Sequence, residues 1–279
     1  MRYTWINGDF VESSKASLGV GDLAIQRGYG VFDFFRCNRG IPFLLTNHLE
    51  RFYNSVHCLN LKVPMDRSVL KNIIAQLIQK NQIKNEGVKM LLTGGYALDE
   101  YTPEEPNLII SSHLITPPGP DKYKRGFRVM SYSYQREIAS CKSINYLQAI
   151  KLIPTLAEKR YDDVLYHTKG IITEFPRSNV FIVDRQNRLA TPAKGMLFGI
   201  TRRLLLHLTK DQYAPQERDI SLSELKEAKE VFLTSTTKRI MPICEVDGIP
   251  IGNGRPGPIS RQLASVLDDV PSDLEIPSN

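Results

Sequence analysis

The stretch Thr116-Pro117-Pro118-Gly119-Pro120 is the one conspicuous break along this chain of 279 residues. Proline fixes φ and lacks a backbone N–H group, so three prolines in five positions favour an extended segment over a helix or a strand. Stretches typical of strands, hairpins and helices alternate on both sides of it. We therefore expect a linker over 116–123, an N-terminal domain over 1–115 and a C-terminal domain over 124–279, with a mixed α+β fold in both domains.

The N-terminal part carries clear local signals. Asn7-Gly8 separates two stretches with β propensity and predicts a hairpin, because both turn positions tolerate positive φ. An apolar stripe predicts a helix over 47–59, with Asn47 and Glu50 as its capping box. A second amphipathic helix is expected to follow Asp66.

The C-terminal part continues the alternation. Residues 127–134 alternate as in a strand, and 145–160 have the period of a helix that Pro154 should interrupt. A further helix is expected over 199–208. These signals predict secondary structure but do not by themselves indicate an activity.

Composition excludes several classes of protein. The chain has 36 Lys+Arg and 30 Asp+Glu, a formal net charge of +6, and 42% apolar residues. The basic residues are scattered, so we expect no nucleic-acid partner. No window approaches the roughly 18 apolar residues of a membrane span, and no secretory signal is visible, so we expect a cytoplasmic protein without a membrane partner. The histidines and the four cysteines lack metal-ligand spacing, so we expect no metal site and no disulfides.

Cys141-Lys142-Ser143-Ile144-Asn145-Tyr146 follows a predicted strand and precedes a helix. A lysine whose pKa is lowered by desolvation can be a neutral amine near pH 7 and can react with an aldehyde. Taken alone, Lys142 could equally be a solvated lysine at a helix start.

Glu174 ends an apolar strand and is soon followed by Ser178-Asn179, which opens another. A carboxylate in this place could keep a pyridinium nitrogen protonated. Glu174 could also be a residue of the rim, and Ser178-Asn179 could be ordinary turn residues.

Two further stretches are suited to anions. Gly199-Ile200-Thr201 lies at a helix N-terminus, and Thr234-Ser235-Thr236-Thr237 follows a strand. Free N–H groups, the helix dipole and adjacent hydroxyls attract negative charge, so the pair suggests a phosphate ligand. Each alone is only a helix cap or a loop.

In combination, these motifs resemble the class IV aminotransferases, the fold-type IV pyridoxal-phosphate family. The family includes branched-chain aminotransferases, D-amino acid aminotransferases and aminodeoxychorismate lyases. The resemblance runs from about Tyr3 to Gly254 and implies a two-domain fold-type IV enzyme with pyridoxal 5'-phosphate as cofactor. The matching motifs, in chain order, are Asn47-His48-Leu49-Glu50-Arg51, Lys142, Thr173-Glu174 with Ser178-Asn179-Val180-Phe181, Gly199-Ile200-Thr201-Arg202 and Thr234-Ser235-Thr236-Thr237.

The resemblance implies catalytic and ring-binding roles for three residues. Lys142 would hold the cofactor covalently and then carry the proton between the substrate α-carbon and the cofactor. Glu174 would pair with the pyridine nitrogen, which keeps the ring an electron sink. Tyr146 would line the cofactor pocket and contact the ring oxygen.

The resemblance also implies a set of phosphate ligands. Arg51 would bind the cofactor phosphate, although its place off the apolar stripe of its helix also permits a solvent-facing side chain. Ile200 and Thr201 would donate backbone and hydroxyl hydrogen bonds, joined by Thr236.

The substrate is indicated less directly. Phe32 fits the position of a phenylalanine that lines an apolar side-chain pocket in branched-chain enzymes. The stretch 93–98 lacks the Arg and His that bind the substrate carboxylate in D-amino acid aminotransferases. The backbone near Ser235 and Thr237 would receive that carboxylate instead. A basic side chain would assist, and the candidates are Arg36, Lys89, which sits about where many branched-chain enzymes carry an arginine, and Arg177.

We therefore predict a PLP-dependent aminotransferase that acts on branched-chain L-amino acids with 2-oxoglutarate as acceptor. D-amino acid transamination and aminodeoxychorismate lyase activity are the alternatives within the family. A cofactor-binding protein without turnover would need neither Lys142 nor Glu174. The resemblance also implies a homodimer.

Overall fold

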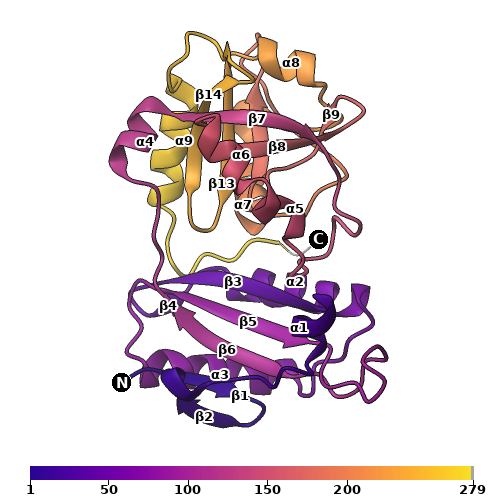
Figure 1. The fold of residues 1–279 in the computed structure, drawn as a ribbon. Coiled ribbons are helices and arrows are strands. Elements are labelled where there is room, and N and C mark those ends of the chain that lie inside the picture. Colours follow the sequence, from indigo (N-terminus) through magenta and orange to yellow (C-terminus); the bar gives the residue numbers. More distant parts are fainter. Residues whose placement is uncertain (278–279) are drawn as a thin grey trace. The chain divides into compact units, whose positions relative to one another are not determined.

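The computed structural model describes residues 1–277, which pack into two units (Figure 1). Unit 1 consists of 1–115, 141–145 and 271–277, and unit 2 of 116–140 and 146–270. The predicted boundaries at 116–123 stay a prediction. The helix α4 (Pro120–Arg125) begins within that predicted linker. Proline is tolerated there because the first turn of a helix does not use its N–H groups.

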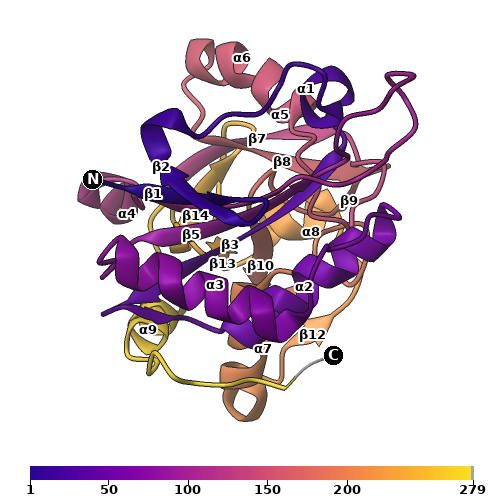
Figure 2. The ribbon, with the colours of Figure 1, turned by 90° about the horizontal axis from the view of Figure 1, so that it is seen from below.

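Unit 1 is built on an antiparallel sheet in the order β2-β1-β6-β5-β3-β4. The helices α2 and α3 lie along one face of this sheet (Figure 2). The elements are β1 (Tyr3–Ile6), β2 (Asp9–Glu12), a 3-10 turn (Ser13–Lys15), α1 (Leu23–Arg27), β3 (Gly30–Asn38), β4 (Ile41–Pro42), α2 (Leu45–Cys58), α3 (Arg67–Lys80), β5 (Gly87–Thr93) and β6 (Leu108–His113).

Local signals in unit 1 predicted most of these elements. The Asn7-Gly8 hairpin is confirmed, with φ of 48° and 121° at the two turn residues. The helix after Asp66 is confirmed as α3. The predicted capping box is wrong, because α2 begins at Leu45 and places Asn47 inside its first turn. There the Asn47 side chain donates to the backbone oxygen of Ile276 at 3.2 Å.

The strand β3 separates two kinds of side chain. Val31, Phe35 and Cys37 are fully buried in the core of unit 1, whereas Phe32 and Phe34 point to the opposite face and are half-buried. This alternation follows from the two-residue period of a strand. The second face therefore presents aromatic rings outside the core.

Unit 2 contains a mixed sheet in the order β12-β11-β10-β13-β14-β7-β8-β9, with β15 paired to β14. The strand β7 runs parallel to both β14 and β8. Besides α4, the elements are β7 (Phe127–Ser133), α5 (Leu147–Lys151), α6 (Ile153–Glu158), β8 (Asp163–Thr168), β9 (Ile171–Ile172), β10 (Asn179–Val183), β11 (Leu189–Thr191), α7 (Ile200–Tyr213), β12 (Gln216–Glu217), α8 (Leu222–Glu227), β13 (Glu230–Ser235), β14 (Arg239–Val246), β15 (Ile249–Pro250) and α9 (Pro258–Asp268).

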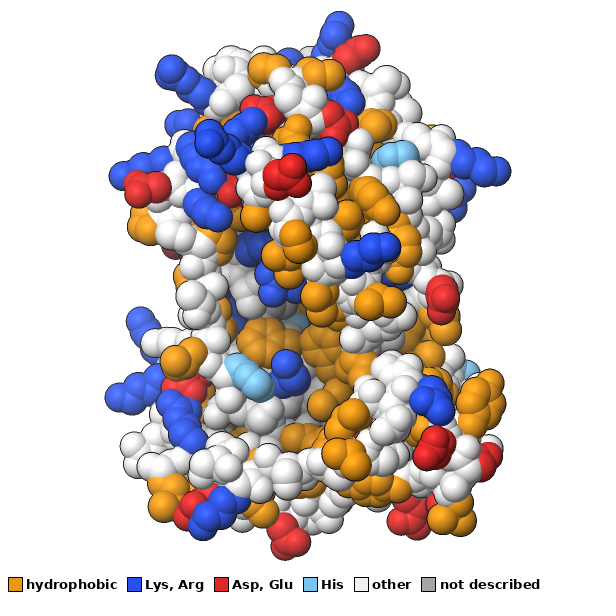
Figure 3. Space-filling view, viewed as in Figure 1, with side chains coloured by type: hydrophobic (Ala, Val, Ile, Leu, Met, Phe, Trp, Pro, Cys, Tyr) orange, Lys and Arg blue, Asp and Glu red, His pale blue; other side chains and the backbone are white. Residues whose placement is uncertain are grey.

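The structure confirms the interruption that Pro154 predicts. The expected helix over 145–160 forms as α5 and α6, with Pro154 in the first turn of α6. The helix α7 continues to Tyr213, beyond the predicted end at 208. Across residues 1–277, every helix is too short or too polar to cross a membrane. Figure 3 shows acidic and basic side chains next to one another on the visible face of each unit.

Candidate active site

Lys142 belongs to unit 1, where its segment pairs with the edge of β3. Its carbonyl accepts a hydrogen bond from the N–H of Phe32 at 3.0 Å, and Ile144 donates to the carbonyl of Gly30 at the same distance. The Lys142 N–H donates to the hydroxyl of Ser55 on α2 at 3.0 Å. These bonds fix the lysine backbone between a strand and a helix, so its side chain starts from a defined position.

The Lys142 side chain lies over an aromatic ring. Its Nζ is 4.5 Å from the centroid of Phe32, a distance typical of a cation–π contact. Cys141, the preceding residue, is fully buried, and its Sγ lies 3.7 Å from the carbonyl oxygen of Ser55. The segment is thus anchored on the core side while the amine faces the Phe32 ring.

Arg51 is buried and bound to a carboxylate of β3. Its Nε donates to Oδ2 of Asp33 at 2.8 Å, and its Nη2 donates to Oδ1 at 2.9 Å. His48, one turn earlier on α2, places Nδ1 2.7 Å from Oδ1 of Asp33. The possibility that Arg51 faces solvent is therefore wrong, since its side chain turns toward the sheet. Two of its three nitrogens bind Asp33, and within residues 1–277 Nη1 forms no hydrogen bond, so it can donate to an anion.

The charges of this cluster follow from burial and pairing. Burial alone raises the pKa of Asp33, but the charges and hydrogen bonds of Arg51 and His48 outweigh it and hold this pKa far below its ordinary value. Burial, together with the positive charges of Arg51 and Lys142, lowers the pKa of His48 despite the opposing charge and hydrogen bond of Asp33. Its imidazole is therefore neutral at pH 7, and we assign Nδ1–H as the donor because a carboxylate only accepts.

Two further predicted residues lie on the same sheet face as Phe32. Arg36 follows on β3 at the four-residue spacing that keeps a side chain on one face, and it is half-buried. Lys89 on β5 stands opposite Phe34, and its Nζ is 5.8 Å from the Phe32 ring. Burial lowers the pKa of Lys89. This face thus combines apolar rings with positive charge.

Glu174 lies in unit 2, where it is 4% exposed. Its Oε2 accepts a hydrogen bond from the N–H of Leu197 at 3.0 Å, and its Oε1 accepts one from Nε of Arg136 at 2.8 Å. Sequence reasoning missed Arg136, which lies 38 residues before its partner. The pairing holds the carboxylate in one orientation and supplies the counter-charge that a buried carboxylate needs.

The N-terminus of α7 is shaped by Asn179 on β10. The Asn179 side chain donates to the carbonyl of Leu197 at 2.7 Å. A Cβ added at Gly199, the residue that precedes α7, would lie 2.0 Å from Oδ1 of Asn179, so a larger residue there would require Asn179 or the helix start to shift. Among the residues that the structure describes, no side chain caps α7, whose first residues are the predicted phosphate ligands Ile200 and Thr201. The first N–H groups of this helix are open to an anion.

The remaining predicted ligands of unit 2 lie at two turns. Thr236 and Thr237 occupy the tight turn between β13 and β14, and the hydroxyl of Ser235 accepts a hydrogen bond from the N–H of Lys238 at 3.0 Å. Tyr146 is half-buried and directly precedes α5. The Ser235 oxygen therefore acts as an acceptor within the turn, while its O–H, the threonine hydroxyls and backbone groups are the donors that a ligand could use.

The predicted residues thus fall into two sets, and their joint action on one ligand stays a prediction. Unit 1 carries Phe32, Arg36, Arg51, Lys89 and Lys142, and unit 2 carries Tyr146, Glu174, Ile200, Thr201, Ser235, Thr236 and Thr237. Sequence reasoning assigned no role to Asp33, although a carboxylate in the middle of an apolar strand signals a buried partner. His48 could have been noticed because it lies three residues before Arg51 on α2.

The chemistry of these residues fits pyridoxal 5'-phosphate. Lys142 offers an amine for the aldehyde, and Glu174 offers a buried acceptor for a protonated ring nitrogen. The start of α7, which follows a glycine and has no side-chain cap among residues 1–277, offers backbone N–H groups to a phosphate. Each part of the cofactor therefore has a chemical counterpart in the chain.

Comparison with known proteins agrees with this chemistry. The family model described as Amino-transferase class IV matches residues 30–246. The chain is 27% identical over 278 residues to a proposed branched-chain-amino-acid aminotransferase of Methanocaldococcus jannaschii, with 95% of each chain covered. It is also 27% identical over 273 residues to a D-alanine aminotransferase of Bacillus licheniformis, with 94% of this chain and 95% of the relative covered.

The fold has a close counterpart among solved structures. The branched-chain amino acid aminotransferase of Escherichia coli superposes with a TM-score of 0.88. The sequence identity is 26%, and 94% of this chain and 92% of the other are covered. This likeness confirms the predicted fold-type IV architecture. The chain therefore belongs to the class IV aminotransferases, which use pyridoxal 5'-phosphate as their cofactor.

Proposed function

We propose that this aminotransferase transfers the amino group of branched-chain L-amino acids to 2-oxoglutarate. The observation that carries the proposal is the Phe32 ring, whose centroid lies 4.5 Å from Nζ of Lys142. An aliphatic side chain bound next to this amine would pack on the ring, and each buried methylene contributes about 0.8 kcal/mol. Leucine, isoleucine and valine gain from such a surface, whereas alanine gains little.

Lys142 and Glu174 carry the proton chemistry in this proposal. When bound, pyridoxal 5'-phosphate supplies an electron sink for the negative charge that develops at the substrate α-carbon. Nζ of Lys142 would take the proton from that carbon and deliver it to the cofactor, so that the amino group stays with the cofactor when the keto acid leaves. Glu174, held by Arg136 and the N–H of Leu197, keeps the proton on the ring nitrogen. Tyr146 orients the ring through its oxygen.

The phosphate is held by charge and by backbone donors. Arg51 contributes Nη1, while Asp33 holds its other two nitrogens. Ile200 and Thr201 contribute N–H groups at the positive end of the α7 dipole, and Thr236 adds a donor from its turn.

Lys89 is our choice for the substrate carboxylate. It is half-buried, and among residues 1–277 no carboxylate forms an ion pair with it. A partly desolvated ammonium without a counter-charge favours an anionic ligand, and 2-oxoglutarate carries two carboxylates. Arg36 lies on the same face, and backbone groups of Ser235 and Thr237 complete the proposed set.

The second candidate is D-alanine transamination. It is favoured by the Bacillus licheniformis relative, whose identity equals that of the Methanocaldococcus jannaschii protein. Sequence identity alone therefore does not choose between the two donors. The choice rests on the apolar face around Phe32 and on the loop 93–98, which has no Arg or His.

A panel of single donors tests the proposal. The purified enzyme is incubated with 2-oxoglutarate and L-leucine, L-isoleucine, L-valine or D-alanine, and the keto acids formed are identified by mass spectrometry. We expect kcat/KM for L-leucine to exceed that for D-alanine by at least about tenfold, which corresponds to two buried methylenes. A higher value for D-alanine would select the second candidate. Pyruvate and 4-aminobenzoate formed from aminodeoxychorismate would select the lyase reaction.

We further infer a cytoplasmic homodimer. The dimer is inferred from the family resemblance, and the location is supported by the cysteines, none of which forms a disulfide within residues 1–277. Sedimentation of the enzyme at micromolar concentration should give the mass of two chains. A monomer with full activity would contradict this inference.

A further inference from the structure

The hydroxyl of Thr234 is buried without a partner. The residue is 1% exposed, and its Oγ1 forms no hydrogen bond with any other atom of residues 1–277. A buried hydroxyl without a partner is costly, and such groups are rare in folded proteins. The Thr234 hydroxyl therefore has a free donor that a ligand could satisfy.

Register places the Thr234 side chain beside the N-terminus of α7. Thr234 on β13 stands directly opposite Asn179 on β10, and side chains of opposite residues lie on the same face of a sheet. The next pair on that face, Phe181 and Phe232, stacks with ring centroids 5.4 Å apart. Asn179 reaches Leu197 and borders Gly199, so the Thr234 side chain shares the sheet face on which α7 begins.

The N-terminus of α7 has the properties of an anion site. The helix has 14 residues, and no side chain within residues 1–277 caps it. The first hydrogen bond within it runs from the N–H of Arg203 to the carbonyl of Gly199, so the N–H groups of Ile200, Thr201 and Arg202 precede the helical ladder. The open helix end and the unpartnered hydroxyl of Thr234 are independent observations that indicate the same ligand.

We propose that Thr234 donates its hydroxyl hydrogen bond to a phosphate group bound at the N-terminus of α7. A phosphate near neutral pH offers oxygens that accept from both the hydroxyl and the N–H groups. The proposal rests on the proposed function, in which this phosphate belongs to pyridoxal 5'-phosphate. The sequence placed Thr234 in a stretch suited to anions but gave its side chain no role, and the proposal assigns its hydroxyl as a ligand of the phosphate.

Cofactor titrations of the full-length protein, freed of its cofactor, test this role. Thr234→Val removes the hydroxyl and keeps the shape of the side chain, whereas Thr234→Ser keeps the hydroxyl. We expect Thr234→Val to weaken binding of pyridoxal 5'-phosphate about ten- to a hundredfold and to leave binding of pyridoxal, which has no phosphate, unchanged. Thr234→Ser should bind both compounds as the wild type does.

Thr209→Val is the matched control. Thr209 is also a buried threonine, but its hydroxyl donates to the carbonyl of Leu205 at 2.7 Å within α7. We expect its affinity for pyridoxal 5'-phosphate to equal that of the wild type. If Thr234→Val bound pyridoxal 5'-phosphate as tightly as the wild type, or lost affinity for pyridoxal to the same extent, the proposal would be overturned.

Inorganic phosphate separates this proposal from the proposed function. Phosphate should raise the Tm of the wild type. It should raise the Tm of Thr234→Val, and that of Thr234→Ala with its smaller side chain, by clearly less. This result would support the anion site even if no amino acid were transaminated. An equal rise in wild type and variants would overturn the role of Thr234, whatever the donor panel gives.

Discussion

The guanidinium of Arg51 is held by the carboxylate of Asp33 through two hydrogen bonds, from Nε to Oδ2 at 2.8 Å and from Nη2 to Oδ1 at 2.9 Å. Asp33 is fully buried and Arg51 is 9% exposed. In our account, the pair orients Arg51 so that Nη1 is presented to the cofactor phosphate. The arginine is therefore prepared for its ligand by the fold of unit 1 itself.

Replacing Asp33 should lower the stability of the protein, because it breaks the buried pair with Arg51. Asp33→Asn leaves Arg51 buried beside a neutral amide, and removal of one partner from a buried ion pair costs about 3–5 kcal/mol. We expect the free energy of unfolding, measured by urea denaturation, to fall by this amount.

Glu227→Gln is the control for that change. Glu227 pairs with Arg185 at 3.4 Å, with both side chains largely exposed. A surface pair of this kind contributes about 0–1 kcal/mol, so the control should remain close to the wild type. If the two variants lost the same free energy of unfolding, the buried Asp33 pair would stabilise the fold no more than a surface pair, and the prediction would be contradicted.

His48 should make stability depend on pH. Its folded-state pKa lies below its ordinary value, mainly because of burial, so the unfolded chain binds more protons as the pH falls below about 6.5. Stability is therefore greatest above that pH and declines toward pH 5. His48→Asn keeps a donor for Asp33 but does not titrate, and we expect a flatter profile of unfolding free energy between pH 7.5 and 5.

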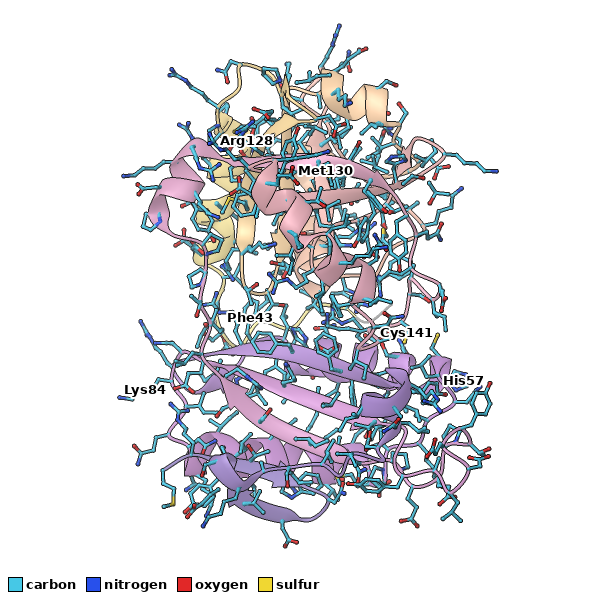
Figure 4. The ribbon with its side chains drawn as sticks, viewed as in Figure 1. Phe43, His57, Lys84, Arg128, Met130 and Cys141 are labelled. Atoms are coloured by element: carbon cyan, nitrogen blue, oxygen red, sulfur yellow. The ribbon has the colours of Figure 1, made fainter. Side chains whose placement is uncertain are left out.

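His57 provides the comparison for this measurement. It lies on the same helix α2 but is exposed (Figure 4). His57→Asn should retain the wild-type dependence of stability on pH. If the pH profile of the unfolding free energy flattened for His57→Asn and not for His48→Asn, the pH dependence would not come from His48, and the prediction would be contradicted.

Arg136 should matter through Glu174. Arg136→Gln removes the positive charge that faces Oε1 of Glu174, and hydrogen bonds to charged groups contribute about 1.5–3 kcal/mol. We expect kcat to fall about ten- to a hundredfold, with a changed absorbance spectrum of the bound cofactor, and we expect Arg136→Lys to recover part of both.

The control for Arg136 is another arginine of unit 2. Arg128 donates two hydrogen bonds to Glu245 on the exposed side of β7 (Figure 4). Arg128→Gln should leave kcat and the spectrum unchanged. A wild-type spectrum in Arg136→Gln would argue that Glu174 needs no counter-charge.

Gly199 should tolerate no side chain. Gly199→Ala places a Cβ 2.0 Å from Oδ1 of Asn179, so the asparagine or the start of α7 must shift. We expect the Kd for pyridoxal 5'-phosphate to rise at least about tenfold, because the shift would remove about one good hydrogen bond to a charged group. Gly119, which precedes α4, has open space around it, so Gly119→Ala should bind the cofactor normally. Normal binding by Gly199→Ala would contradict the predicted phosphate site.

Local signals explain which parts of the fold could be predicted. The Asn7-Gly8 hairpin depends on its two turn residues, and α3 depends on an apolar stripe within one helix. Both signals lie close together in the sequence, and both elements were predicted. The start of α2 was not, because the Asn47 side chain binds Ile276, which is 229 positions away. A capping motif predicts a helix start only when no distant partner competes for its side chain.

Contacts distant in sequence explain what could not be predicted about the site. Nothing near Arg136 marks it as the partner of Glu174, and nothing in the Lys142 segment shows that it pairs with β3. The packing of α2 turns Arg51 toward Asp33, whereas its helical position alone also allowed a solvent-facing side chain. The residue types indicated the chemistry, but the partners that orient them depend on the folded chain.

The most direct test of the account identifies the lysine that carries the cofactor. Two lysines, Lys142 and Lys89, have their Nζ atoms near the Phe32 ring, at 4.5 Å and 5.8 Å from its centroid. The enzyme is reduced with borohydride, which makes the bond between lysine and cofactor permanent, and its peptides are mapped by mass spectrometry. We predict the pyridoxyl group on Lys142 and an unmodified Lys89. A label on Lys89, or on any lysine other than Lys142, would contradict the account.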